Sequence, residues 1–149
     1  MKTKVNEISI KYRGNFKISQ APKITSSQSA TELLFSSWNR DQIGLQECFK
    51  VMLLNNANKV KGIFEVSTGG ITGTLVDLRI LFAVVLKSLA VNLILAHNHP
   101  SGTLTPSNAD KALTMKIKNA AVLFDVKVLD HLIITPDGDY FSFADEGLL

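Results

Sequence analysis

The sequence predicts an α/β fold, a three-layer single domain in which helices flank a central mixed β-sheet. Three observations lead to this prediction. Short apolar runs, typical of buried strands, alternate with segments that begin at helix-capping residues. The chain of 149 residues has the size of one domain and shows no internal repeat or linker. Hydrophobic residues make up 46% and charged residues 19%, which is a globular composition and not a disordered one.

The first part of the chain predicts a strand, a loop and a helix. Residues 5–12 read as a short strand, and residues 14–30 as a polar loop with a proline and a run of serine and threonine. Ser29 and Glu32 have the spacing of a capping box, which predicts a helix that continues through Trp38. A polar stretch directly after Trp38 ends this helix.

The middle of the chain predicts a hairpin, a helix and a further strand. Residues 46–54, QECFKVMLL, and residues 60–67 are two strands joined by a turn, and three glycines follow them. Asp77 can cap a helix over about residues 78–90. Residues 91–96 then form a buried strand that leads directly into a pair of histidines.

The last part of the chain predicts a helix followed by two strands. Ser107 begins a helix that runs to about Leu123. Residues 126–135 form the next strand, a Pro-Asp-Gly turn follows, and residues 140–143 form the final strand. Strands that alternate with helices in this way indicate a layered α/β sheet.

Composition excludes several classes of protein. The formal net charge of +3 is only mildly basic, and Cys48 is the single cysteine. One cysteine excludes an internal disulfide and a zinc site built on several thiolates, that of the zinc deaminases included. The N-terminal sequence MKTKVNEISIKYRG lacks the apolar core of a signal peptide. The longest apolar run, residues 80–96, contains Lys87 and Asn92 and is shorter than the about 20 residues of a membrane span. We therefore expect a soluble cytoplasmic protein with no membrane partner.

Residues 95–110, LAHNHPSGTLTPSNAD, hold the strongest chemical signal. His97 and His99 project to the same side of the strand, because side chains alternate along it. They lie at its C-terminal end, where open α/β sheets place their ligand sites. Asp110, in the first turn of the next helix, can fold back toward both imidazoles. Two histidines and one carboxylate, with a fourth position left to water, make up a catalytic zinc site.

Other interpretations of these residues are possible. Ser107 and Asp110 also have the spacing of a capping box, so the aspartate can complete an ordinary helix start. Two histidines and a carboxylate also suit a non-haem iron oxygenase. Two same-face histidines, a rigid turn and a returning carboxylate together are hard to explain by packing alone, and this favours a metal site.

The motif resembles that of a known family. His97-x-His99, seven residues, then Ser107-x-x-Asp110 is similar to the metal-binding signature of the JAB/MPN (JAMM) metalloprotease domains. The fuller wording HNHPSG…PSNAD resembles the bacterial RadC branch of that family, as do GTLVDLR, LDHLII and YFSFADEG. The resemblance implies a RadC-like JAB/MPN domain of cytidine-deaminase-like fold over residues 26–149. Residues 1–25 would then be an N-terminal strand and loop extension.

The resemblance also implies the chemistry. His97, His99 and Asp110 would bind zinc, and Ser107 would steady the site and help polarise the scissile carbonyl. A zinc-activated water would attack a peptide or isopeptide bond in a protein or peptide substrate.

The family's motif further requires a glutamate on an early strand as general base. Glu47 and Glu65 are both candidates by spacing, and the resemblance aligns Glu47 with the catalytic position. For Glu65 an exposed strand residue is the expected role. His131 is expected to be a buried core histidine or a neighbour of the metal ligands.

The RadC name is attached to DNA repair, and longer relatives carry an N-terminal helix-hairpin-helix module. Only some 25 residues precede the matching region here, so we expect a short form without that module, and the modest charge gives nucleic-acid binding weak support. The alternative to a hydrolase is a metal-binding accessory protein, associated with DNA repair or a mobile element, without peptidase turnover.

Overall fold

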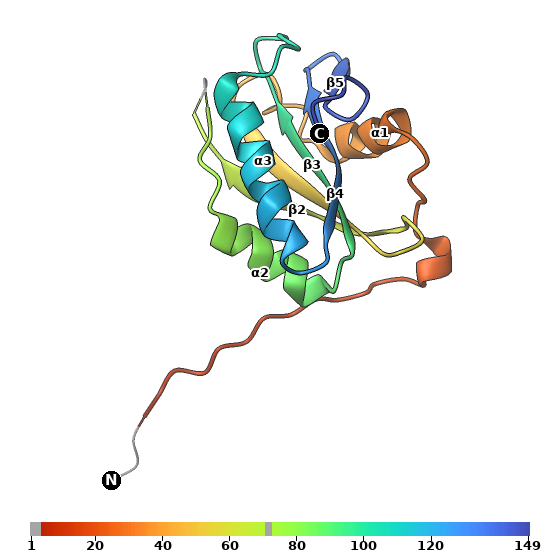
Figure 1. The fold of residues 1–149 in the computed structure, drawn as a ribbon, viewed down its shortest axis with the longest axis vertical. Coiled ribbons are helices and arrows are strands. Elements are labelled where there is room, and N and C mark those ends of the chain that lie inside the picture. The colour runs from red at the N-terminus through yellow and green to blue at the C-terminus, as the bar shows by residue number, and fades with distance from the viewer. Residues whose placement is uncertain (1–3, 71–72) are drawn as a thin grey trace.

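The computed structural model describes residues 4–70 and 73–149, and they form a five-stranded mixed sheet between helices (Figure 1). The order of the strands is β2-β1-β3-β4-β5. The predicted α/β fold with helices on both faces of a mixed sheet is therefore confirmed. The elements are a 3-10 helix Ile18–Gln20, α1 Ser27–Ser37, β1 Cys48–Leu54, β2 Val60–Thr68, α2 Leu78–Ser88, β3 Asn92–Asn98, α3 Asn108–Val122, β4 Lys127–Ile134 and β5 Tyr140–Ser142.

The sheet is mixed because only one of its strand pairs is parallel. β1 pairs antiparallel with both β2 and β3, and β4 pairs antiparallel with β5. β3 and β4 run parallel, and α3 forms the crossover between them. The end of β3 and the start of α3 are therefore joined by one loop at the edge where ligand sites of such sheets lie.

Alternating side chains give the sheet a separate hydrophobic core on each face. Phe49 and Val51 of β1 and Leu95 of β3 pack with α2 and α3, whereas Met52 and Ala96 pack with α1 on the opposite face. This alternation is the physical reason that neighbouring positions in the histidine motif point to different sides of the sheet.

A β-bulge in β4 changes which of its residues face α3. Leu93 pairs with Val128, but the next residue, Ile94, pairs with Asp130, so Leu129 is an extra residue in β4. Val128 packs in the core under α2 and α3. Because of the extra residue, His131 also points to that face, toward the N-terminal half of α3.

The predicted strand at residues 5–12 is wrong. The segment is exposed and has no strand ladder to a described neighbour. At Tyr12 it contacts β2: the hydroxyl donates to the Lys61 carbonyl at 3.0 Å, and the ring faces the Lys61 ammonium. Alternating apolar residues predict a strand only where a partner strand supplies backbone hydrogen bonds. As Figure 1 shows, this N-terminal segment leads away from the sheet.

The predicted cap of the first helix is also wrong by three residues. Ser26, not Ser29, is the N-cap: its hydroxyl oxygen accepts the Ser29 N–H at 3.1 Å. The Ser29 hydroxyl oxygen in turn accepts the Ser26 N–H at 3.0 Å, so a serine takes the place usually held by glutamate or glutamine. Glu32 instead accepts a hydrogen bond from Gln28 within the helix.

The other two predicted caps are confirmed. Asp77 accepts the Arg79 N–H at 2.9 Å and begins α2, and Ser107 begins α3. The predicted hairpin and the remaining strands also form, with ends that differ by a few residues. Among the described residues, no helix has both the length and the apolarity needed to cross a membrane.

Candidate metal centre

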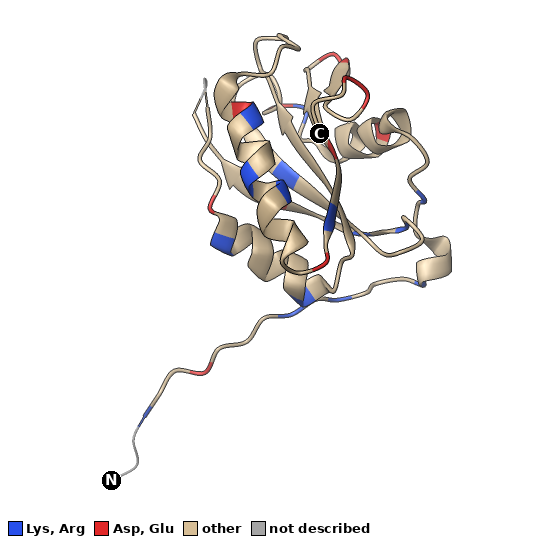
Figure 2. Cartoon of the chain, in the orientation of Figure 1, with Lys and Arg blue, Asp and Glu red and all other residues tan. Residues whose placement is uncertain are grey.

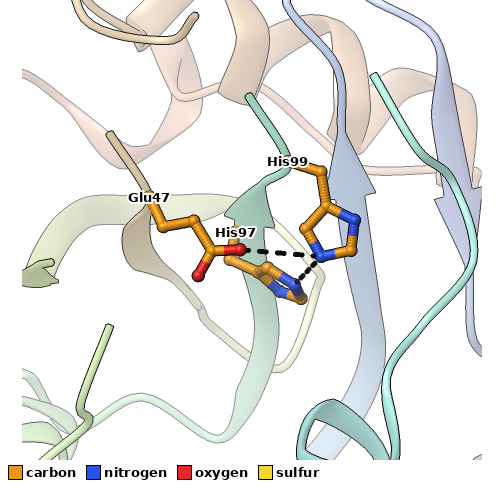
Figure 3. Close-up of side chains that lie close together, drawn as sticks. All are labelled: Glu47, His97 and His99. Atoms are coloured by element: carbon orange, nitrogen blue, oxygen red, sulfur yellow. Dashed lines mark hydrogen bonds and ion pairs between the residues drawn. The ribbon is translucent and has the colours of Figure 1, made fainter. Parts of the chain in front are cut away.

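Two imidazoles and two carboxylates converge beyond the C-terminal end of β3. The Nε2 atoms of His97 and His99 lie 3.0 Å apart. Asp110 places Oδ1 3.4 Å from the His97 Nε2 and Oδ2 3.4 Å from the His99 Nε2. Glu47 approaches from the residue before β1, with Oε1 3.8 Å from the His99 Nε2 (Figure 3).

This donor set fits a divalent metal ion. Glu47, His97 and His99 each offer one ligand atom, and these atoms lie within 4.8 Å of one another. The carboxylate of Asp110 faces both imidazoles from the first turn of α3. Imidazole nitrogens and carboxylate oxygens crowded together in this way would repel one another unless a cation or protons lie between them, and they are the ligands that zinc prefers.

The turn after β3 fixes the orientation of His99. Its Nδ1 lies 2.7 Å from the carbonyl oxygen of Thr103, and because a carbonyl only accepts, this nitrogen carries the proton. The Nε2 of a neutral His99 therefore presents a lone pair to the centre. Gly102 closes the same turn by donating its N–H to the His99 carbonyl at 3.0 Å, with a φ of 83° that suits glycine.

Packing and a hydrogen bond hold His97. Its ring is buried and stacks on Phe49, with the ring planes 6° apart. Its Nδ1 lies 2.7 Å from the Nε2 of His131, which is itself completely buried. His131 is thus the neighbour of a candidate metal ligand, and its burial lowers its pKa well below the ordinary value.

Asp110 both caps α3 and faces the candidate metal centre, so the two interpretations of its sequence position are compatible. Its Oδ2 accepts the Ser107 N–H at 2.9 Å, and the Ser107 hydroxyl oxygen accepts the Asp110 N–H at 3.0 Å, which completes a capping box. The same carboxylate faces His97 and His99. Burial raises the pKa of Asp110, but hydrogen bonds with the two imidazoles in their protonated form outweigh burial and hold the pKa below its ordinary value. Conversely, the Asp110 carboxylate raises the pKa of His99, with burial opposing it.

The two candidate glutamates have different surroundings. Glu47 lies at the centre, and its backbone is held by a hydrogen bond from its N–H to the Gly70 carbonyl at 3.1 Å. Glu65 instead accepts hydrogen bonds from the Cys48 thiol at 2.9 Å and the Thr68 hydroxyl at 3.2 Å. The structure therefore brings Glu47, and not Glu65, together with the histidines.

Asn98, between the two histidines, was not identified from the sequence. It points to the opposite face of the sheet and is fully buried. Its side-chain oxygen accepts the Cys48 N–H at 2.7 Å, and its amide nitrogen donates to the carbonyls of Ile43 and Gln46 at 2.7 and 2.8 Å. Strand alternation could have assigned this face, but the partners are 50 or more residues away in the sequence.

The centre opens into a surface cleft of about 440 Å³. Glu47, His99, Ser107 and Asp110 all line this cleft. A second pocket of about 410 Å³ lies between residues 10–18 and β2, and no histidine, cysteine or carboxylate is among the described residues that line it. Of these two pockets, the cleft beside the candidate metal centre is therefore the one with groups suited to catalysis.

Comparison with known proteins relates most of the chain to one family. A family model described as a RadC-like JAB domain matches residues 24–148. A UPF0758 protein of Flavobacterium johnsoniae is 51% identical over 128 residues, which cover 85% of this chain and 53% of that protein. A UPF0758 protein of Porphyromonas gingivalis is 48% identical over 104 residues, or 70% of this chain and 46% of that protein. The chain thus spans about half the length of the curated relatives it matches.

Proposed function

The chain belongs to the RadC-like JAB domain family, and on this premise we propose that it is a zinc-dependent hydrolase that cleaves a peptide or isopeptide bond. One observation carries the proposal. The Nε2 atoms of His97 and His99 and the carboxylates of Asp110 and Glu47 meet at an open cleft. A protein or peptide is the substrate class that this chemistry suits.

His97, His99 and Asp110 would hold the zinc ion. When bound, zinc lowers the pKa of its water toward about 7 and polarises a carbonyl oxygen. The same ligand types also suit iron, but a further carboxylate beside the centre favours hydrolysis, because hydrolysis needs a base for the proton of water.

Glu47 is the proposed general base. Its carboxylate lies 3.8 Å from the His99 imidazole, close enough to reach a water molecule at the centre. It would take the proton of the attacking water and return that proton to the leaving amine. Backbone hydrogen bonds with Gly69 and Gly70 hold Glu47 in position beside β1. This transfer therefore needs no large movement of the glutamate.

Ser107 is the proposed partner of the substrate carbonyl. Its oxygen already accepts the Asp110 N–H at 3.0 Å, which fixes the position of the side chain at the edge of the cleft. The hydroxyl proton can then be donated to a carbonyl oxygen, which gains negative charge as the tetrahedral centre forms.

Metal analysis of the untagged protein tests the site first. We expect about one zinc per chain in the wild type and in Glu47→Gln, and loss of zinc in His97→Ala and Asp110→Asn, because the last two remove ligands. Inductively coupled plasma mass spectrometry of the purified variants measures this. Iron in place of zinc would support an oxygenase, and a folded wild type that takes up no added zinc would refute the metal site.

Hydrolysis of peptide and isopeptide-linked substrates then tests the reaction. Glu47→Gln should reduce the rate by about 10²–10⁴-fold while zinc stays bound, because it removes the base alone. Glu65→Gln is the matched control: it changes a glutamate on the neighbouring strand that contacts Cys48, and it should leave both zinc and turnover unchanged. Equal loss in both variants would contradict the role of Glu47.

A further inference from the structure

A chain of three buried side chains leads from the metal centre into the protein. The Nδ1 of His97 lies 2.7 Å from the Nε2 of His131, and the Nδ1 of His131 lies 2.6 Å from the Thr114 hydroxyl oxygen. Thr114 is in the second turn of α3, and its hydroxyl donates to the carbonyl of Asp110 at 2.7 Å. His97, His131 and Thr114 each have an exposed fraction of 3% or less.

The donors and acceptors of this hydrogen-bonded series can be arranged in two directions. If the Thr114 hydroxyl donates to the Asp110 carbonyl, its oxygen accepts from the Nδ1–H of His131. The Nε2 of His131 then accepts the Nδ1–H of His97. The Nε2 of His97 is left with a lone pair that faces the centre, as a metal ligand requires.

The reverse direction is unsuited to a metal. If the Thr114 hydroxyl instead donated to His131, His131 would donate to the Nδ1 of His97, and the His97 proton would be on Nε2. That proton would point at the His99 Nε2, 3.0 Å away, and would occupy the position of the ion. The Asp110 carbonyl, which accepts the Thr114 hydroxyl, selects the first direction.

Ring packing keeps His131 in place between its two partners. Its ring lies against Phe143, with centroids 4.7 Å apart and planes inclined by 14°. Phe49 packs against it in a T-shaped arrangement, with centroids 5.5 Å apart. Because both aromatic neighbours are buried, the imidazole cannot rotate away without opening the core.

We propose that Thr114 and His131 are positioning residues that hold His97 in its metal-binding tautomer. The inference rests on the proposed function, which it extends from the ligands to the residues that orient them. Asp110 then contributes twice, with its carboxylate toward the metal and its main-chain carbonyl toward Thr114. One hydroxyl on α3 thus links the position of the helix to the protonation pattern of a ligand on β3.

Zinc affinity of three threonine variants tests the proposal. Thr114→Val keeps the shape but removes the hydroxyl, and it should weaken zinc binding about 10–100-fold in competition with a chromophoric chelator. Thr114→Ser restores the hydroxyl and should restore affinity close to wild type. Thr31→Val is the matched control, since Thr31 is also a buried helical threonine but its hydroxyl has no hydrogen-bond partner among the described residues. Equal zinc affinity in Thr114→Val and wild type would overturn the proposal.

Nitrogen-15 NMR of the histidines in zinc-loaded wild type gives a readout that does not depend on any variant. The proposal requires a proton on the Nδ1 of His97 and a proton on the Nδ1 of His131. A spectrum with the proton of His131 on Nε2 would overturn it.

The outcomes separate this proposal from the proposed function. Zinc-loaded wild type that hydrolyses no peptide or isopeptide substrate would refute the hydrolase, while the affinity series and the NMR spectrum still decide the role of Thr114 and His131. A wild type that binds no zinc would overturn both.

Discussion

Asp110 shows how one side chain serves structure and chemistry at the same position. Its carboxylate caps α3 through the Ser107 N–H and faces both imidazoles at 3.4 Å. The cap fixes the rotamer, so the charge is directed at the centre before any ion binds. A carboxylate near the positive end of a helix is also stabilised by the helix dipole. The helix start therefore preorganises a candidate ligand.

Cys48 is predicted to be unreactive in the native protein. Burial, and then the hydrogen bond to the Glu65 carboxylate, raise the pKa of its thiol to about 12. At pH 8 the native thiol should be ionised about 10³-fold less than an unfolded thiol of pKa about 8.5. Iodoacetamide should therefore label the protein quickly only in guanidinium chloride, as mass spectrometry can follow.

The same pKa shift predicts how stability depends on pH. The unfolded thiol loses its proton at lower pH than the native one, so this contribution is complete below pH about 8.5 and declines as the pH rises toward 12. Cys48→Ala should lack this decline relative to wild type. Rapid iodoacetamide labelling of the native protein at pH 8 would contradict the raised thiol pKa on which both predictions depend.

At the scale of elements, neighbouring side chains at the end of β3 make contacts on both faces of the sheet. His97 points toward α3, and Asn98 points toward the α1 side, where it holds the segment before β1. The last paired residues of β1 and β3 are Phe49 and His97, so beyond them the Asn98 side chain takes the place of ladder hydrogen bonds. The strand that carries the histidines thus also holds the backbone on both sides of Glu47.

Asn98→Ala should destabilise the protein by about 2–4 kcal/mol, because it leaves several buried backbone groups without a partner. Chemical denaturation measures this change in the free energy of unfolding. Asn92→Ala, at the other end of β3, removes only a part-buried hydrogen bond to Asn58 and should cost about 1 kcal/mol or less. Similar losses in the two variants would show that Asn98 has no special role.

At the scale of the whole molecule, charge is divided unevenly along the chain. The first 25 residues contain six of the 16 basic residues and one of the 13 acidic residues, so the rest of the chain is net acidic. Figure 2 shows the basic residues of the described part scattered over α2, α3 and the strands as well as the N-terminal segment. The basic charge of the described residues is therefore spread over several elements and is not gathered on one of them.

Zinc should stabilise the whole fold, because its proposed ligands come from β3, the loop after it and α3. At a free zinc concentration of about 100 times Kd, the native state should gain about 2.7 kcal/mol. For a chain of this size, that gain corresponds to a rise in Tm of about 5–10 °C. Differential scanning calorimetry with added zinc, and then with a chelator to reverse the effect, measures this rise.

Asp110→Asn is the control for the zinc effect, because the capping oxygen stays in place while the charged ligand is lost. Its Tm should respond much less to added zinc than that of the wild type. An equal rise in both proteins would mean that zinc stabilises the fold by binding elsewhere.

The sequence alone was sufficient to predict most of the helices and strands of the fold. Local signals, such as the short apolar runs of β1 and β3 and the caps at Asp77 and Ser107, act over a few residues, so they can be read from a single chain. The strand predicted at residues 5–12 failed because its pattern was local but its stability depends on a distant partner. The histidine motif was evident for the same reason as the caps, since its spacing places two ligands on one side of a strand.

Only the tertiary structure decided which distant residues join that motif. Spacing alone left both Glu47 and Glu65 open, and only the family resemblance favoured Glu47. Pairing of β1 with β3 brings Glu47 to the histidines, while Glu65 turns to Cys48. The bulge at Leu129, which sets the face of His131, leaves no clear mark in the sequence. Sequence by itself therefore determined the candidate ligands and their strand and helix. Long-range pairing, which depends on the packing of the whole chain, determined which glutamate lies beside the histidines and which residues contact His97.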